Sequence, residues 1–285
     1  MTTTEIAKPV WMKALAVDDD EYGYPKSIML YGKPGTRKTS LAASLVKRPD
    51  RPTVVLLDVD EGAEALINDD EILAAKKEGR LTVIDVWWEK DENGNPVRRK
   101  SNEQVFTEVD YILQDLANNN YGIDFVIIDT LNLLQEVAVE HFLETTVNSS
   151  GKKDVQAAWG EISKWTNKRA RALHGAPFIT AIFNMHEKVA TEETGYVSIV
   201  PKLQGGAKDS IAGIPSLVAN LSFQKNLDGS ETDLVAILGD SDIHVSKNRY
   251  SRFLDNRMTD FSLLRLYEQL DEHLATAPKP AAVAA

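Results

Sequence analysis

Cysteine is absent from the sequence of 285 residues. The absence excludes disulfide scaffolds, thiol nucleophiles and thiolate metal sites. Long hydrophobic runs are absent too. No stretch approaches the roughly 18 apolar residues that a membrane span requires, and the first residues, MTTTEIAKPVW, lack the basic start and apolar core of a secretion signal. We therefore expect a cytoplasmic protein without a membrane partner.

Basic residues are fewer than acidic residues. The chain has 32 Lys and Arg residues against 43 Asp and Glu residues, which gives a net charge of −11. Such a balance argues against a surface that coats any polyanion indiscriminately, although local basic patches remain compatible with it. Hydrophobic residues make up 43% of the chain and charged residues 26%, so the composition is that of an ordinary globular protein.

Apolar runs of strand length alternate with longer amphipathic segments. This alternation is typical of an α/β fold with a mostly parallel sheet and helices on both faces. One helix is predicted to begin at a capping box of Ser101 and Gln104, and another to run from Asp154 to Leu173. The predicted strands cover residues 27–31, 53–58, 81–86, 123–129 and 177–183.

After Phe183 the pattern changes to short alternating runs. Hairpin signals at 192–195 and 228–230 indicate a β-rich C-terminal extension of the sheet. Residues 91–101 are predicted to form an exposed loop, and a last helix to run from about residue 260 to 274. The chain then divides into an N-terminal arm (1–25), an α/β core (26–258), a C-terminal helix (259–275) and a disordered tail (276–285).

A glycine-bearing loop follows the first predicted strand and precedes a helix, in the segment SIMLYGKPGTRKTSLAASL. It approximates the phosphate-binding motif G-x-x-x-x-G-K-[ST], whose amides and lysine hold phosphates and whose hydroxyl binds Mg²⁺. The alternative is a coincidental turn before a helix. The candidate nucleotide-binding residues are Gly32, Lys33, Pro34, Gly35, Thr36, Arg37, Lys38, Thr39 and Ser40, with Thr39 as a metal ligand.

Arg37 stands where the motif has its second glycine. Glycine at that place lets the backbone approach the phosphates without a Cβ in the way. Two interpretations follow. Either the loop tolerates Arg37 with its side chain turned outward and available for a phosphate contact, or tight nucleotide binding is lost and the loop is structural.

Acidic residues end two of the predicted strands. Asp129 closes IDFVIIDT and can hold the hydration shell of Mg²⁺ beside Thr39. VVLLDVDEG ends in a cluster that includes Asp58, Asp60 and Glu61, at the sheet edge where open α/β sheets bind ligands. Asp60 or Glu61 can orient a water as general base; the alternative is a solvated acidic turn.

The order of these parts resembles a RecA-type ATPase core over about residues 25–255. The matching segments are GKPGTRKT, AspValAsp at 58–60, Asp129, AsnMetHis at 184–186 and LysAsnArg at 247–249. The sequence is most similar to the compact phage-encoded RecA-like P-loop ATPases that act in recombination and single-strand annealing. The resemblance implies ATP and Mg²⁺ as cofactors and single-stranded DNA as partner. It also implies assembly into a ring or filament, a single-stranded-DNA-binding protein as a further partner, and the host cytoplasm as location.

The resemblance also suggests roles for residues outside the loop. His186 would sense the γ-phosphate, and Lys247 and Arg249 would act as fingers that reach a neighbouring subunit's nucleotide; the alternatives are a polar strand end and a solvated basic strand end. The segment from 187 to 210 matches a DNA-binding loop in position only, with Lys202 and Lys208 as candidate contacts to DNA or, alternatively, as parts of a plain hairpin.

Asp60 stands where members of the family carry Glu, which together with Arg37 predicts slow hydrolysis. The favoured function is a DNA-stimulated ATPase acting on single-stranded DNA. The alternatives are a non-hydrolysing DNA-annealing module with structural nucleotide, a DnaB-like helicase motor, and a small-molecule kinase. A helicase motor is disfavoured because a separate helical N-terminal domain is missing, and a kinase because no lid or acceptor site is evident.

Overall fold

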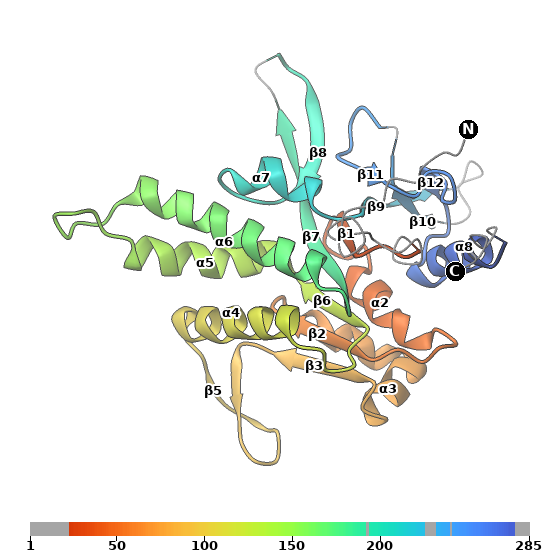
Figure 1. Ribbon diagram of the computed structural model, residues 1–285, viewed down its shortest axis with the longest axis horizontal. Coiled ribbons are helices and arrows are strands. Elements are labelled where there is room, and N and C mark those ends of the chain that lie inside the picture. Colours follow the sequence, from red (N-terminus) through yellow and green to blue (C-terminus); the bar gives the residue numbers. More distant parts are fainter. Residues whose placement is uncertain (1–22, 192–193, 226–231, 240, 277–285) are drawn as a thin grey trace, which may run out of the picture.

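One large sheet organises the chain in the computed structural model, which describes residues 23–191, 194–225, 232–239 and 241–276 (Figure 1). The sheet has ten strands and the order β12-β10-β9-β1-β7-β6-β2-β3, with β11 paired to β9 and β8 paired to β7. The strands are β1 (Ser27–Gly32), β2 (Val54–Asp58), β3 (Leu81–Asp85), β6 (Phe125–Asp129), β7 (Thr180–Thr191), β8 (Val197–Pro201), β9 (Leu217–Lys225), β10 (Thr232–Ile237), β11 (Lys247–Asn248) and β12 (Arg257–Met258).

The pairings from β3 across to β9 are parallel, and β8, β10, β11 and β12 pair antiparallel. The prediction of a mostly parallel sheet with a β-rich C-terminal extension is therefore confirmed. β7 is longer than predicted, because it continues past Phe183 into a hairpin with β8. The turn of this hairpin at 192–193 and the signal at 228–230 lie outside the described residues.

Helices cover both faces of the sheet, as predicted (Figure 1). β1 shows why, because its side chains alternate between two cores: Met29 and Tyr31 join one cluster, Ile28 and Leu30 the other. The first cluster includes α4 (Asn102–Asn118), α5 (Leu131–Thr145) and α6 (Val155–Gly175). The second includes α2 (Lys38–Ala43), α3 (Asp70–Lys77) and α8 (Leu263–Thr276). Short helical turns complete the chain: η2 (Ser44–Lys47), η3 (Gly62–Asn68), α7 (Ala207–Ser210) and η4 (Ile211–Gly213).

Local signals set the helix starts correctly. The Ser101 hydroxyl accepts the Gln104 amide and the Gln104 side chain accepts the Ser101 amide, which forms the predicted capping box of α4. Asp154 caps α6 by accepting the amide of Ala157. Val155 is apolar, yet it is 56% exposed because it lies in the first turn of α6.

The prediction of an exposed loop at 91–101 is wrong in part. This region forms a hairpin of β4 (Trp88–Lys90) and β5 (Pro96–Arg99). Its tight turn is closed by the Asp91 carboxylate, which accepts the amides of Asn93 and Asn95. Every residue of β5 is exposed, so the alternation of apolar and polar residues that marks a half-buried strand is missing.

Several predictions fall at the chain ends. α8 begins at Leu263 rather than near 260, and Asp260 has a left-handed backbone with φ of 49°. Residues 1–22 of the expected arm and 277–285 of the expected tail lie outside the described residues. Among the described residues, no helix is long and apolar enough to cross a membrane.

Candidate nucleotide-binding site

The predicted phosphate loop joins β1 to α2 at the carboxyl edge of the sheet. A Cβ on Gly32 would lie 2.4 Å from the carbonyl oxygen of Leu221 on the adjacent β9, so only glycine fits there. Gly35 has φ of 83°, which lets the loop reverse. The buried Thr36 hydroxyl donates to the Lys33 carbonyl at 2.9 Å and closes the loop on itself. The loop is therefore shaped by its own residues together with the neighbouring strand β9.

Arg37 adopts the conformation that a glycine would take. Its φ is 59° and its ψ is 22°, in the left-handed region. The exposed side chain turns outward, and its guanidinium lies over the ring of Phe223 at 5.5 Å from the centroid. The side chain is thus turned outward, as the first interpretation requires. This contact with a ring on β9 is one that the sequence could not show.

Lys38 opens α2 and is 6% exposed. Its ammonium donates to the carbonyls of Gly32 and Lys33 at 3.2 and 3.0 Å, and to the Thr36 hydroxyl at 3.3 Å. Burial lowers the pKa of Lys38, while the carboxylates of Asp129 and Asp60 act in the opposite direction. A cation held inside the loop by loop carbonyls is suited to contact an anionic group that enters it.

Asp129 ends β6 and offers a buried oxygen for a metal ion. Its Oδ1 accepts the side-chain amide of Asn184 at 3.1 Å, while its Oδ2 is buried without a hydrogen-bond partner. A Cβ on Gly62 would lie 3.4 Å from the Thr39 hydroxyl and 3.9 Å from Asp129 Oδ2, so both oxygens face the same space. Burial raises the pKa of Asp129. An ion such as Mg²⁺ would satisfy this oxygen.

No group of three or more His, Asp or Glu side chains within the described ranges is arranged to hold a metal by itself. Mg²⁺ does not need such a cage, because in phosphate-transfer sites it keeps several waters and takes only one or two carboxylates plus phosphate oxygens. Thr39 and Asp129 fit that pattern. Ser40, the next candidate, lies half-buried in the first turn of α2.

The turn after β2 is held from both sides. The Asp58 carboxylate accepts the amides of Gly62 and Ala63 at 2.9 and 3.2 Å. The amides of Val59 and Asp60 donate to the Asp129 carbonyl at 2.6 and 2.9 Å, which ties the turn to the metal-binding strand. Burial raises the pKa of Asp58 from 3.8 to about 6. Asp58 therefore stabilises the turn, and Asp60 and Glu61 in that turn are the candidates for a catalytic role.

Asp60 and Glu61 point to different partners. Asp60 Oδ2 lies 3.3 Å from His186 Nε2, on β7 directly beside β1. Glu61 has φ of 52°, and its carboxylate lies 3.7 Å from the guanidinium of Arg99 on the β4–β5 hairpin. The strand order puts β7 next to the phosphate loop and β3 with its hairpin at the far edge. The geometry favours Asp60 over Glu61 for a role beside a nucleotide.

Comparison with known proteins identifies a family. The family model described as "AAA domain" (AAA_24) matches residues 24–250, most of the chain. The chain belongs to this AAA domain family. No curated protein matches it. Among solved structures, it is similar to the flagellar accessory protein FlaH from Methanocaldococcus jannaschii, at 11% identity and a TM-score of 0.41 over 82% of this chain and 83% of that chain.

As an AAA domain with a phosphate loop, the chain carries the parts of an ATP-binding site. The structure brings the loop residues together with Thr39, Asp129, Asp60 and His186 at the carboxyl edge of the sheet. His186 is anchored by its backbone amide, which donates to the Asn132 side chain at 2.9 Å. Asp129 and Asn184 are direct register partners, so the metal-binding strand and the strand of His186 are locked in phase.

The other predicted residues of the AAA domain lie elsewhere. β11 pairs with the amino half of β9 through Lys247 and Val218, whereas the phosphate loop lies past the carboxyl end of β1. Lys247 donates to the Gly213 carbonyl at 2.6 Å, and the Arg249 amide to the Ser216 carbonyl at 3.4 Å. The pair therefore does not lie beside the phosphate loop.

The candidate DNA contacts are also separate from the loop. Lys202 lies 3.2 Å from the Glu136 carboxylate on α5, so its charge has a local partner. Lys208 belongs to α7, and its side chain lies outside what the structure describes. Contacts of Lys202 and Lys208 with DNA remain predictions.

Sequence reasoning missed the residues that support the site from a distance. Asn132 comes three residues after Asp129, at the start of α5, and this short spacing is the only local signal that it belongs to the site. Arg99 and Trp87 carry no motif. Arg99 stacks over the Trp87 ring at 5.0 Å, and the Trp87 indole donates to the Val59 carbonyl at 2.9 Å. Together with the Arg99–Glu61 pair, these contacts connect the hairpin to the turn of Asp60.

Proposed function

We propose that this AAA domain hydrolyses ATP slowly and that single-stranded DNA stimulates the hydrolysis. The protein acts on that DNA in recombination or strand annealing. One observation carries the proposal. Lys38, Thr39, Asp129 and Asp60 meet at the carboxyl edge of a parallel sheet, where open α/β sheets bind their ligands.

Each residue has a chemical task in this proposal. Lys38 and the loop amides bind the β- and γ-phosphates, and Thr39 and Asp129 would hold Mg²⁺, which when bound neutralises charge that develops on the phosphates. Asp60 orients the attacking water as general base. His186 lies 3.3 Å from the Asp60 carboxylate and reports the state of the phosphate to β7 and β8.

Slow turnover follows from the same contacts. The Asp60 side chain is one methylene shorter than Glu, and it already has a partner in His186. The base must leave or share that contact before it can orient water. Rates at the low end of phosphoryl-transfer enzymes, near or below about 1 s⁻¹, are the expected consequence.

A second copy of the chain would complete the site. Lys247 and Arg249 lie toward the amino ends of the parallel strands, away from their own phosphate loop. In a head-to-tail ring or filament, this edge of one subunit can face the nucleotide of the next. The proposal assigns these two residues to stabilise charge on a neighbour's γ-phosphate.

A non-hydrolysing annealing module with structural nucleotide is the second candidate. Arg37 in a strained, glycine-like conformation and the short Asp60 favour it. An ATPase assay with and without single-stranded DNA separates the two candidates, with Lys38→Ala as the negative control. DNA-stimulated phosphate release supports hydrolysis, whereas ATP binding without turnover selects the annealing module.

The finger assignment has its own test. A Lys247→Ala, Arg249→Ala double variant is mixed with excess Lys38→Ala protein. If the fingers act between subunits, some interfaces in the mixture pair an intact loop with intact fingers, and hydrolysis returns. The effect should be large, because an arginine supplied by a neighbouring subunit is worth about 10³-fold or more in rate. Light scattering with ATP and DNA verifies that both proteins still assemble. Absence of rescue in assembled mixtures would reject the finger role.

A further inference from the structure

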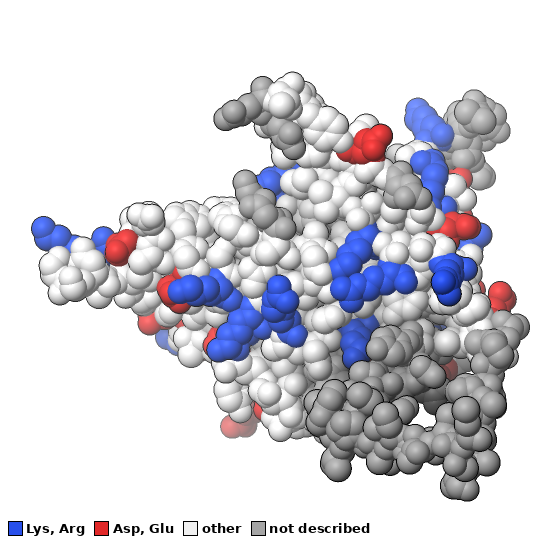
Figure 2. All heavy atoms as spheres, turned by 45° about the horizontal axis from the view of Figure 1, so that its top comes forward, with Lys and Arg blue, Asp and Glu red and all other residues white. Residues whose placement is uncertain are grey.

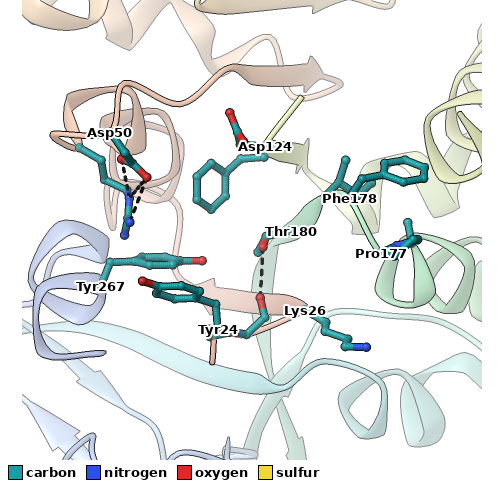
Figure 3. A pocket seen from close by; sticks show the side chains of 13 residues that line it. Tyr24, Lys26, Asp50, Asp124, Pro177, Phe178, Thr180 and Tyr267 are labelled. Carbon is teal, nitrogen blue, oxygen red and sulfur yellow. Dashed lines mark hydrogen bonds and ion pairs between the residues drawn. The ribbon is translucent and has the colours of Figure 1, made fainter. Parts of the chain in front are cut away.

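A cavity lies at the amino ends of the strands, on the opposite edge of the sheet from the phosphate loop. Its volume is about 320 Å³, within the roughly 300–1,000 Å³ of small-ligand sites. It forms where Pro25, Asp124 and Ile179 lead into β1, β6 and β7, closed by α8 and the segment after η2. Figure 3 shows Tyr267 and Tyr24 on one side of it, Phe178 and Pro177 on another, and Lys26 at its edge.

Aromatic rings form the cavity's walls. Tyr24 and Tyr267 stack at 5.9 Å between centroids with 29° between planes. Tyr267 meets Phe125 edge-on at 5.6 Å, and the Arg48 guanidinium lies over the Tyr267 ring at 4.5 Å. Phe178 adds a further ring. Such walls offer stacking surfaces to a flat ligand.

Two buried donors in the cavity lining have no partner. The Tyr267 hydroxyl and the Arg48 Nη1 atom are both buried without a hydrogen bond, and the whole Tyr267 residue is only 2% exposed. Burial raises the pKa of Tyr267, so its hydroxyl keeps its proton and can donate. The remaining nitrogens of Arg48 are occupied by Asp50 at 3.1 Å and Asp271 at 3.6 Å. The unpaired donors call for an acceptor such as a carbonyl oxygen.

Positive charge gathers beside the cavity. Lys26 lines it, and Lys26, Arg171, Lys247 and Arg249 together act on His174, whose ring lies 2.7 Å from the Ser27 hydroxyl at the start of β1. Burial and these four cations lower the pKa of His174. Figure 2 shows Lys and Arg side chains gathered across the middle of one face with few carboxylates between them. The four cations that act on His174 therefore lie together near the amino ends of the strands.

We propose that the cavity binds one base of a single-stranded DNA, while Lys26 and Arg171 contact the phosphates that flank it. A base supplies what the lining lacks: a flat face for the rings and, in thymine, carbonyl oxygens for Tyr267 and Arg48. Stacking platforms combined with a basic track are how proteins hold single strands without reading sequence. The choice of DNA as ligand rests on the proposed function; the cavity and its unpaired donors do not.

The test compares two probes on three proteins in the absence of nucleotide. The probes are fluorescein-labelled oligothymidylate of about twelve nucleotides, within the usual site size, and an abasic strand of the same length. The variants are Tyr267→Phe, which removes only the unpaired hydroxyl, and Tyr121→Phe, a control that removes an exposed hydroxyl bonded to Asp115 at the end of α4.

The wild-type chain is expected to bind oligothymidylate more tightly than the abasic strand. Tyr267→Phe should weaken oligothymidylate binding by roughly 2–12-fold, the range of one neutral hydrogen bond, and leave abasic binding unchanged. Tyr121→Phe should change neither. Urea unfolding of Tyr267→Phe should show equal or higher stability, because the variant buries no unpaired hydroxyl.

A second variant guards against a small hydroxyl effect. Tyr24→Ala removes an exposed stacking ring and should weaken oligothymidylate binding by roughly 5–150-fold. The cavity proposal would be overturned if the wild type bound both probes with equal affinity and if Tyr267→Phe and Tyr24→Ala bound oligothymidylate as tightly as the wild type. The proposed function would still stand. Absence of any DNA binding by the wild type would overturn both. Base-dependent binding without DNA-stimulated ATP hydrolysis would overturn only the proposed function.

Discussion

The carboxyl group of Asp58 should make the stability of the protein depend on pH. It is 6% exposed, and burial raises its pKa from 3.8 to about 6, reinforced by the charge of Asp129 and opposed by the two amide hydrogen bonds. Between these two pKa values the folded state binds more protons than the unfolded state. The contribution of Asp58 to stability is therefore present at low pH and is lost as pH rises through about 6.

The magnitude follows from the shift. A shift of about two pKa units corresponds to about 3 kcal/mol, since each unit is worth 1.36 kcal/mol. Roughly half of this loss falls between about pH 5 and pH 8. Asp58→Asn abolishes the titration but keeps one acceptor oxygen, so one of the amides of Gly62 and Ala63 loses its bond. That cost is independent of pH and does not affect the comparison.

Urea unfolding at several pH values measures the effect as the difference between wild type and variant. The wild type should lose stability relative to Asp58→Asn as the pH rises. Asp85→Asn removes only a neighbouring charge and should reduce the pH dependence without abolishing it, because Asp85 is the half-buried register partner of Asp58 on β3 and its charge raises the pKa of Asp58. A difference that stays constant from about pH 4 to pH 8, or that grows in the opposite direction, would refute the assignment of a buried, proton-binding Asp58.

Other predictions concern the loop and the hairpin. Lys38→Ala should weaken binding of a fluorescent ATP analogue by roughly 10–150-fold, the range of one charge-assisted contact, while Lys164→Ala, at an exposed position of α6 where the lysine pairs with Glu161, should not; equal effects would contradict the assignment. Arg37→Gly should change the unfolding free energy by less than about 1 kcal/mol, because relief of backbone strain offsets the lost ring contact, and it should not weaken ATP binding. Weaker binding would show that the guanidinium leaves Phe223 for the phosphates. Arg99→Ala should lower the hydrolysis rate without changing ATP affinity, because it frees the turn of Asp60, whereas Arg98→Ala, whose side chain pairs with Glu89, should do neither. Similar rates in both variants would separate the hairpin from the site.

Much of the ATP site could be predicted from the sequence because its parts are local. The strand β1, a glycine-bearing loop and the helix α2 follow one another directly in the sequence. Asp129 ends an apolar run, and the change from apolar to polar residues marks the end of that strand. The capping box of α4 depends on two residues three positions apart. Hydrogen bonds and hydrophobic periodicity within a few residues determine these features, so no knowledge of the rest of the chain is needed.

The tertiary structure alone decided which carboxylate faces the site and what surrounds it. Asp60 and Glu61 are neighbours in sequence, yet one meets His186 on β7 and the other Arg99 on a hairpin that the sequence does not mark. Arg37 is supported by a ring far along the chain. The aromatic cavity draws on segments from both ends of the described chain. Such contacts depend on strand order and on which side chains meet across it, and these are set by packing between distant segments rather than by any local pattern.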